Sequence, residues 1–207
     1  MNRITMPVVG INRHRIVTDG TGVTTLVASH GCPLDCKYCI NKEYLKPEML
    51  VACEYMSAEQ LYNKLKIDDL YFVATNGGVA FGGGESLLYA DFIKEFREIC
   101  GKRWRIVVET SLNISCENLY KVIPVVDEYS IDIKDINPEI YEAYTGKGNA
   151  RVIDNLKILI KEKGPENIYI RIPSIKNYNT DRDMAYSVKF LKEMGYSNIE
   201  TFSYIIK

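Results

Sequence analysis

Three cysteines within eight residues are the part of this chain best suited to chemistry. Cys32, Cys36 and Cys39 follow a C-x3-C-x2-C spacing, and the other three cysteines are scattered. Clustered thiols in a reducing compartment indicate metal binding or catalysis rather than disulfides. Three thiolates leave one iron of a four-iron cluster without a protein ligand, so that iron can bind a substrate or cofactor. The alternative is zinc, with His30 completing a Cys3His tetrahedron.

The composition is that of an ordinary soluble globular protein. The 207 residues include 26 basic and 27 acidic side chains, which gives a net charge of −1, and 46% are apolar. These values exclude a disordered chain, a collagen-like fibre and a coiled-coil rod, and they give no reason to expect nucleic-acid binding. No apolar run approaches the roughly 20 residues that span a bilayer. Residues 1–10 also lack the apolar stretch of a signal peptide.

We therefore expect a single domain over residues 1–207, located in the cytoplasm, with no membrane or nucleic-acid partner. The scattered cysteines are expected to be small buried apolar residues, because free cysteine is among the most buried residue types. These three residues are Cys53, Cys100 and Cys116.

Apolar strands alternate with amphipathic helices along the chain. The predicted strands are residues 22–29, 78–81, 105–110, 128–134, 167–173 and 198–206. The predicted helices are residues 57–66, 90–100, 116–123, 138–145, 149–163 and 180–194. On the helix at 90–100, Phe92, Ile93, Phe96 and Ile99 share one apolar face. This alternation predicts an α/β fold with parallel strands and crossover helices. Six units are too few for a closed eight-stranded barrel, so we expect an open partial (β/α)6 barrel with helices outside.

Polar or glycine residues stand at the carboxyl ends of five predicted strands, where parallel α/β folds bind their ligands. In strand order they are Cys32, the run Gly82–Gly84, Glu109, the pair Asp132 and Lys134, and Arg171. Asp132 alternates with apolar neighbours, so it is expected to face the barrel interior rather than solvent. For Arg171 the alternative is a structural ion pair with Glu109 or Asp132. For the glycine run the alternative is a plain loop.

Longer motifs around these residues resemble those of the radical SAM superfamily. They are HGCPLDCKYCIN (30–41), VAFGGGESLL (79–88), SIDIKD (130–135), YTGKGN (144–149) with VIDNLKIL (152–159), and IRIP (170–173). Within that superfamily, their order and spacing resemble the pyruvate formate-lyase activating enzymes, the activases of glycyl radical enzymes. The resemblance extends from about residue 11 to residue 204.

The resemblance implies a [4Fe-4S] cluster on the three clustered cysteines, with S-adenosylmethionine on the fourth iron. The methionyl amine would be held by Gly83, Gly84 and Glu85. The adenine would be lined by Tyr38, Cys39 and Ile40, although Tyr38 is also suited to the core. Further cofactor contacts would come from Asp132, Ile133, Lys134 and Arg171. A monovalent cation would bind between Glu109, Thr110 and Asp132.

The implied reaction is reductive cleavage of S-adenosylmethionine to a 5′-deoxyadenosyl radical, which abstracts a glycine hydrogen from a partner glycyl radical enzyme. A flavodoxin- or ferredoxin-type donor would supply the electron. One departure concerns the end of the chain, where Ile205 replaces a histidine of the family. Three alternatives therefore stay open: modification of a peptide or small molecule, a non-catalytic zinc module, and an inactive homologue. The apolar pair Ile205–Ile206 also raises the hypothesis of an edge-strand contact.

Overall fold

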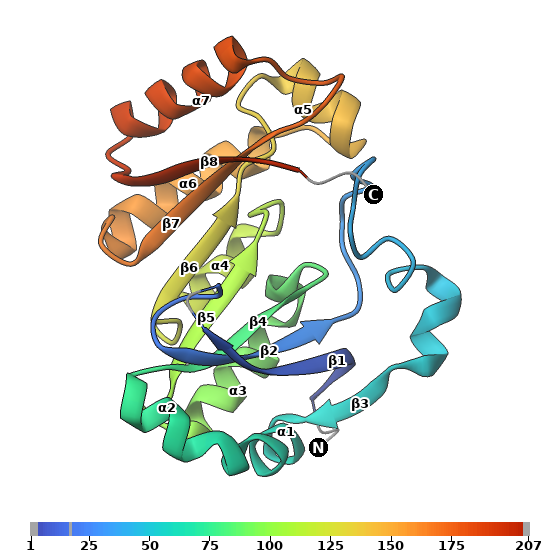
Figure 1. Ribbon diagram of the computed structural model, residues 1–207, viewed down its shortest axis with the longest axis vertical. Coiled ribbons are helices and arrows are strands. Elements are labelled where there is room, and N and C mark those ends of the chain that lie inside the picture. The colour runs from blue at the N-terminus through green and yellow to red at the C-terminus, as the bar shows by residue number, and fades with distance from the viewer. Residues whose placement is uncertain (1–3, 17, 205–207) are drawn as a thin grey trace.

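An eight-stranded sheet forms the centre of the molecule, in the order β3-β1-β2-β4-β5-β6-β7-β8 (Figure 1). The computed structural model describes residues 4–16 and 18–204. The strands are β1 (Thr5–Ile16), β2 (Val23–Ser29), β3 (Glu54–Ser57), β4 (Gly78–Gly83), β5 (Arg105–Thr110), β6 (Glu128–Asp132), β7 (Ile168–Ser174) and β8 (Asn198–Ser203). The α-helices are α1 (Ala58–Leu65), α2 (Asp69–Thr75), α3 (Ala90–Cys100), α4 (Cys116–Val122), α5 (Pro138–Thr145), α6 (Ala150–Lys163) and α7 (Asp181–Glu193). Short 3-10 helices occupy Pro47–Ala52, Lys66–Asp68 and Ser86–Tyr89.

Six consecutive strands of the sheet, β2-β4-β5-β6-β7-β8, pair in parallel, and helices connect them on the outer side. This arrangement confirms the predicted open α/β partial barrel. The parallel strands are rich in β-branched and apolar residues because the sheet is covered by helices on its convex side.

Two antiparallel strands at one edge were not predicted. β1 pairs with β2 and with β3, and both pairings are antiparallel. Pro7, Gly10 and the charged residues of β1 obscure its apolar pattern. A residue of β1 in an unusual conformation, His14 (φ 56°), lies where the register between β1 and β2 shifts. Such bulges interrupt the strict alternation by which a strand is predicted.

The helix boundaries follow local capping signals. α1 begins with a capping box between Ser57 and Gln60, and α7 begins with one between Thr180 and Asp183. α5 ends at Gly146, whose left-handed conformation (φ 71°) suits the residue after a helix.

The apolar core lies between the sheet and the helices. Phe81 of β4 packs edge-on against Phe96 of α3, with ring centroids 5.4 Å apart. One prediction for α3 was wrong: Ile99 is exposed, and Cys100 is the buried residue of that last turn. Among the three scattered cysteines predicted to be buried, Cys116 is exposed, because it begins α4 at the surface, and Cys53 is only partly buried.

The edge-strand contact predicted from the sequence involves two residues beyond the end of β8. β8 ends at Ser203, and Ile205 and Ile206 lie outside the described residues. In the part of the chain that is described, we find no helix of the length and apolarity that a membrane span needs.

Candidate functional site

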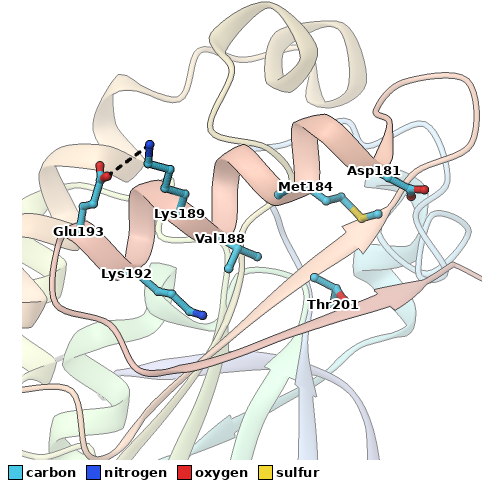
Figure 2. Close-up of a pocket in the computed structure, with 8 residues that line it drawn as sticks. Asp181, Met184, Val188, Lys189, Lys192, Glu193 and Thr201 are labelled. Atoms are coloured by element: carbon cyan, nitrogen blue, oxygen red, sulfur yellow. Dashed lines mark ion pairs between the residues drawn. The ribbon is translucent and has the colours of Figure 1, made fainter.

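The candidate site is distinguished from the other cavities by the side chains that line it and not by its volume. A groove of about 700 Å³ runs between α7 and β8 (Figure 2). It is lined by apolar Met184 and Val188, with Thr201 on the strand side and a surface ion pair on its rim. A smaller cavity of about 240 Å³ lies at the carboxyl ends of the parallel strands. Reactive and charged side chains converge on this smaller cavity, hereafter the strand-end cavity.

All but one of the predicted site residues line the strand-end cavity. They are Cys32, Cys36, Tyr38, Cys39, Ile40, Gly83, Gly84, Glu85, Glu109, Asp132, Lys134 and Arg171, and Thr110 is also present. The exception is Ile133, whose side chain is fully buried in the apolar core on the other face of the sheet. Ile40 stands at the rim and is 89% exposed.

The C-terminal end of α5 holds the cysteine loop in place. The backbone N–H of Asp35 donates to the carbonyl of Thr145 (2.9 Å), and that of Lys37 donates to the carbonyl of Tyr144 (3.1 Å). Both acceptors are carbonyls of the last turn of a helix, which have no partner within the helix. The loop thereby fixes Cys36 between two anchored residues.

His30 lies behind the cysteine loop. Its Nε2 lies 3.1 Å from the carbonyl of Lys46, and its own carbonyl accepts from the Tyr89 hydroxyl (2.7 Å). His30 is not among the residues that line either of the two cavities shared by the cysteines, as far as the described residues go.

The donor set of the strand-end cavity fits an iron–sulfur cluster with one open iron. Burial raises the pKa of Cys36 to about 11, and nearby Lys134 opposes that effect. A thiol in such surroundings stays protonated unless a cation binds it as thiolate. Three soft sulfur ligands from one loop suit iron, and the cavity beside them leaves room for a further ligand.

The backbone segments at the ends of β2 and β4 lie so close together that glycine is required between them. Gly84 donates its N–H to Ser29 (2.9 Å), and Glu85 donates its N–H to Gly31 (2.8 Å), so β4 and the end of β2 are closely joined. A Cβ at Gly84 would lie 2.1 Å from the Gly31 carbonyl oxygen. Only glycine allows this approach, so the run is more than a plain loop.

The carboxylate of Glu85 fastens the end of β5 to the end of β4. One oxygen accepts from the Thr110 hydroxyl (2.7 Å) and the Leu87 N–H (3.2 Å). The other oxygen accepts from the N–H (2.9 Å) and the hydroxyl (2.7 Å) of Ser111. With Glu85 only 1% exposed, these four donors offset part of the lost solvation of its charge, and burial still raises the pKa of Glu85.

Opposite charges form a chain along the concave face. Arg171 Nε donates to Asp132 (2.8 Å), and its guanidinium lies 3.6 Å from the carboxylate of Glu109. Lys134 Nζ donates to the other Asp132 oxygen (3.1 Å). Burial alone would raise the pKa of Asp132, but Lys134 and Arg171 outweigh it and lower that pKa. Burial raises the pKa of Glu109, whose partner is more distant. The ion pair considered for Arg171 is therefore present, and the residue lines the cavity as well.

Tyr38, Tyr144 and Tyr204 line the cavity from separate segments, Tyr178 packs against Tyr144 without lining it, and sequence reasoning identified only Tyr38. The Tyr144 ring lies 6.1 Å from that of Tyr38, 5.2 Å from that of Tyr178 and 6.4 Å from that of Tyr204. The Tyr204 hydroxyl accepts from Lys134 Nζ (2.9 Å). These residues are up to 166 positions apart (204 − 38), and no local pattern connects them. The placement of Tyr144 directly before the TG motif was the only available signal.

The comparisons with known proteins define the family. The family description of the radical SAM superfamily matches residues 26–191, which is most of the chain. The chain therefore belongs to the radical SAM superfamily. That family works with a [4Fe-4S] cluster and S-adenosylmethionine, so the cofactor prediction is supported at the level of the family.

The most similar curated proteins include several activating enzymes. The (2S)-3-sulfopropanediol dehydratase activating enzyme of Klebsiella oxytoca is 27% identical, and the alignment covers 80% of this chain and 70% of that protein. The pyruvate formate-lyase-activating enzyme of Clostridium pasteurianum is 30% identical over 75% of this chain and 62% of its own length. These activases confirm the resemblance stated from the motifs. The chain spans from 54% to 80% of the length of the first activases it matches.

Solved structures support the fold. Streptococcus suis SuiB is 15% identical with a TM-score of 0.63, over 84% of this chain and 37% of that one. AdoMet-bound anSMEcpe is 17% identical with a TM-score of 0.64, over 84% of this chain and 49% of that one. At these identities the likeness concerns the fold alone.

Proposed function

We propose that this chain activates a partner glycyl radical enzyme. The observation that carries the proposal is the convergence of three thiols, the glycine run and the Asp132–Lys134–Arg171 charge chain on one cavity. The activating-enzyme relatives support the same reaction class. A [4Fe-4S] cluster held by the three thiols would supply, once reduced, the electron for cleavage of S-adenosylmethionine to methionine and a 5′-deoxyadenosyl radical that takes a hydrogen from glycine.

The residues of the chain would divide the binding work. Cys32, Cys36 and Cys39 would ligate the cluster, and backbone groups at Gly83 and Gly84 would hold the methionyl amine. The Lys134 ammonium, buried beside the thiols, would attract the cofactor carboxylate. Glu85 would act by positioning, because its carboxylate already accepts four hydrogen bonds, one from Leu87 in the 3-10 helix after β4 and three from Thr110 and Ser111 at the end of β5.

The remaining binding predictions are part of the proposal. Tyr38, Cys39 and the rim residue Ile40 would line the adenine. A monovalent cation would bind near Glu109, Thr110 and Asp132; the weakly paired Glu109 carboxylate favours this. A flavodoxin- or ferredoxin-type protein would supply the electron. Exchange of potassium for lithium in the assay tests the cation, since a loss of cofactor affinity is expected only if it is bound.

The proposal is tested under anaerobic conditions. The purified protein is reconstituted with iron and sulfide, given reductant and S-adenosylmethionine, and assayed for 5′-deoxyadenosine by mass spectrometry. We expect the nucleoside from the wild type and from Cys116→Ala, whose thiol lies at the surface on α4, but not from Cys36→Ala. A glycyl-radical doublet in the electron paramagnetic resonance spectrum of a partner encoded alongside it would then identify the substrate.

Other outcomes would point to the alternatives. A coloured cluster without the nucleoside would indicate an inactive homologue. Colourless protein with one zinc and no sulfide would indicate the zinc module. A mass change in a co-expressed peptide, with no radical on a protein partner, would indicate peptide modification.

A further inference from the structure

The Tyr144 hydroxyl is a buried polar group without a partner in the described part of the chain. Tyr144 is 1% exposed, and its hydroxyl makes no hydrogen bond of ordinary length to any residue that the structure describes, although burial raises its pKa and the Tyr204 hydroxyl lies close enough to add to that rise. A buried hydroxyl of this kind costs free energy in the unliganded protein, so its presence calls for an explanation. Tyr144 also lines the strand-end cavity, and a molecule bound there would supply the missing partner.

The backbone around Tyr144 is held rigidly against the cysteine loop. Its carbonyl accepts the N–H of Lys37, which stands between two of the clustered cysteines. The next residue, Thr145, is fully buried, and its hydroxyl donates to the carbonyl of Tyr141 (2.7 Å). The hydroxyl of Tyr144 is therefore fixed at the cavity by the same segment that fixes the thiols.

The neighbouring tyrosines use their hydroxyls elsewhere. The Tyr204 hydroxyl accepts from Lys134 (2.9 Å), and the Tyr38 hydroxyl accepts from Asn177 (3.5 Å). Tyr178 is only partly buried and can reach solvent. Tyr144 is thus the member of the group whose hydroxyl is enclosed and lacks a hydrogen bond of ordinary length within the described residues.

Two further tyrosines that line the cavity with Tyr144, namely Tyr38 and Tyr204, offer aromatic surface to a planar heteroaromatic base. Tyr38 and Tyr178 stand edge-on at 5.8 Å, and Tyr144 and Tyr204 lie nearly parallel at 6.4 Å and 30°. Aromatic side chains stack on nucleobases, and a fixed hydroxyl adds a directional hydrogen bond. The charged groups of the cavity, in contrast, suit the amino-acid half of the cofactor.

We propose that the Tyr144 hydroxyl binds the nucleoside half of S-adenosylmethionine. This inference rests on the proposed function, because it takes the cofactor to occupy the strand-end cavity. It assigns a binding role to a residue of α5 that lies 105 positions beyond the last clustered cysteine (144 − 39).

The test compares two variants that each remove one unpartnered buried hydroxyl. Tyr144→Phe alters the cavity, whereas Tyr129→Phe alters a fully buried residue of β6 that belongs to the apolar core. Affinities of the reconstituted enzyme for S-adenosylmethionine, 5′-deoxyadenosine and methionine are measured by anaerobic calorimetry. We expect Tyr144→Phe to weaken the two nucleoside ligands about 3- to 10-fold, as the loss of one hydrogen bond does. Its affinity for methionine, and all three affinities of Tyr129→Phe, should match those of the wild type.

Each contrary result has a definite meaning. Unchanged nucleoside affinity in Tyr144→Phe would overturn the inference and leave the proposed function standing. A loss confined to methionine would overturn it by placing the hydroxyl at the amino-acid half. Failure of the wild type to bind S-adenosylmethionine would overturn both. Thermal unfolding of the unliganded variants controls for folding, and neither melting temperature should fall, because no hydrogen bond of the described structure is removed.

Discussion

Replacing Glu85 with glutamine changes one atom and should destabilise the protein measurably. The carboxylate accepts four hydrogen bonds, two on each oxygen. An amide has one oxygen, so its NH2 group must face either the Leu87 N–H or the Ser111 N–H. In both orientations one backbone donor is buried opposite another donor. Hydroxyl groups can rotate to adapt, but a backbone N–H cannot.

The expected cost follows from that count. One backbone N–H loses a hydrogen bond to a charged acceptor, and the remaining bonds lose their charge assistance, while relief from burying a carboxylate compensates in part. We expect the free energy of unfolding to fall by about 2–3 kcal/mol. For a chain of this size that corresponds to a melting temperature lower by about 4–12 °C.

The assay is urea unfolding followed by circular dichroism, with the affinity for S-adenosylmethionine as a second readout. Glu109→Gln serves as the matched control, because in the described part of the chain the Glu109 carboxylate accepts no hydrogen bond and pairs with Arg171 only at 3.6 Å. The control should lose less than about 1 kcal/mol. Equal stability of Glu85→Gln and the wild type would refute the view that Glu85 fastens β5 to β4.

Three further predictions concern other parts of the chain. Gly84→Ala should lower the affinity for S-adenosylmethionine at least about tenfold, because the added methyl group would collide with the Gly31 carbonyl at the cavity. The affinity is measured by calorimetry on the reconstituted variant, and a wild-type value would contradict the prediction. Asn155→Ala should reduce the free energy of unfolding, measured in urea, by about 2–3 kcal/mol, since the Asn155 amide donates to two buried carbonyls after β5 at 2.8 and 2.9 Å. A loss below about 1 kcal/mol would show that water replaces the amide as the donor to these carbonyls. The hydrogen bond from Arg103 holds the pKa of Asp69 at about 2, so the stabilisation is present above the unfolded pKa of about 4 and is lost as pH falls towards 2. Asp69→Asn should therefore lose less stability than the wild type between pH 4 and pH 2, and parallel urea midpoints over that range would contradict the assignment.

Local signals explain which elements could be predicted from the sequence. The boundaries of α3, β5 and α5 were predicted to the residue. Gly101 marks the end of α3, and Asn137 and Gly146 mark the two ends of α5. The predicted strands at 78–81 and 198–206 differ from β4 and β8 at their carboxyl ends. Strand ends in a parallel sheet depend on the neighbouring strand, which the local sequence does not contain.

The candidate site was predicted where motifs are contiguous and missed where they are not. The three clustered cysteines, Gly83, Gly84, Asp132 and Lys134 belong to short motifs, and all of them line the cavity. Tyr204 was noted only as the last residue of the resemblance, and Tyr178 was not noted at all. Their contribution depends on packing between segments that are distant in sequence. The four donors around Glu85 also come from residues up to 26 positions away, so its positioning role could not be read from the GGE motif.

The long sequence separation within the strand-end cavity has a consequence for biosynthesis. The cysteine loop leaves the ribosome 172 residues before Tyr204 (204 − 32), the residue that contacts Lys134 on the far wall. At cellular rates of synthesis this interval is about 10–30 s. During it the thiols belong to a nascent chain whose parallel strands cannot all have paired, because such non-local pairing requires the complete sheet. The thiols are therefore synthesised long before the cavity that encloses them, which is complete only once the chain has been made as far as Tyr204.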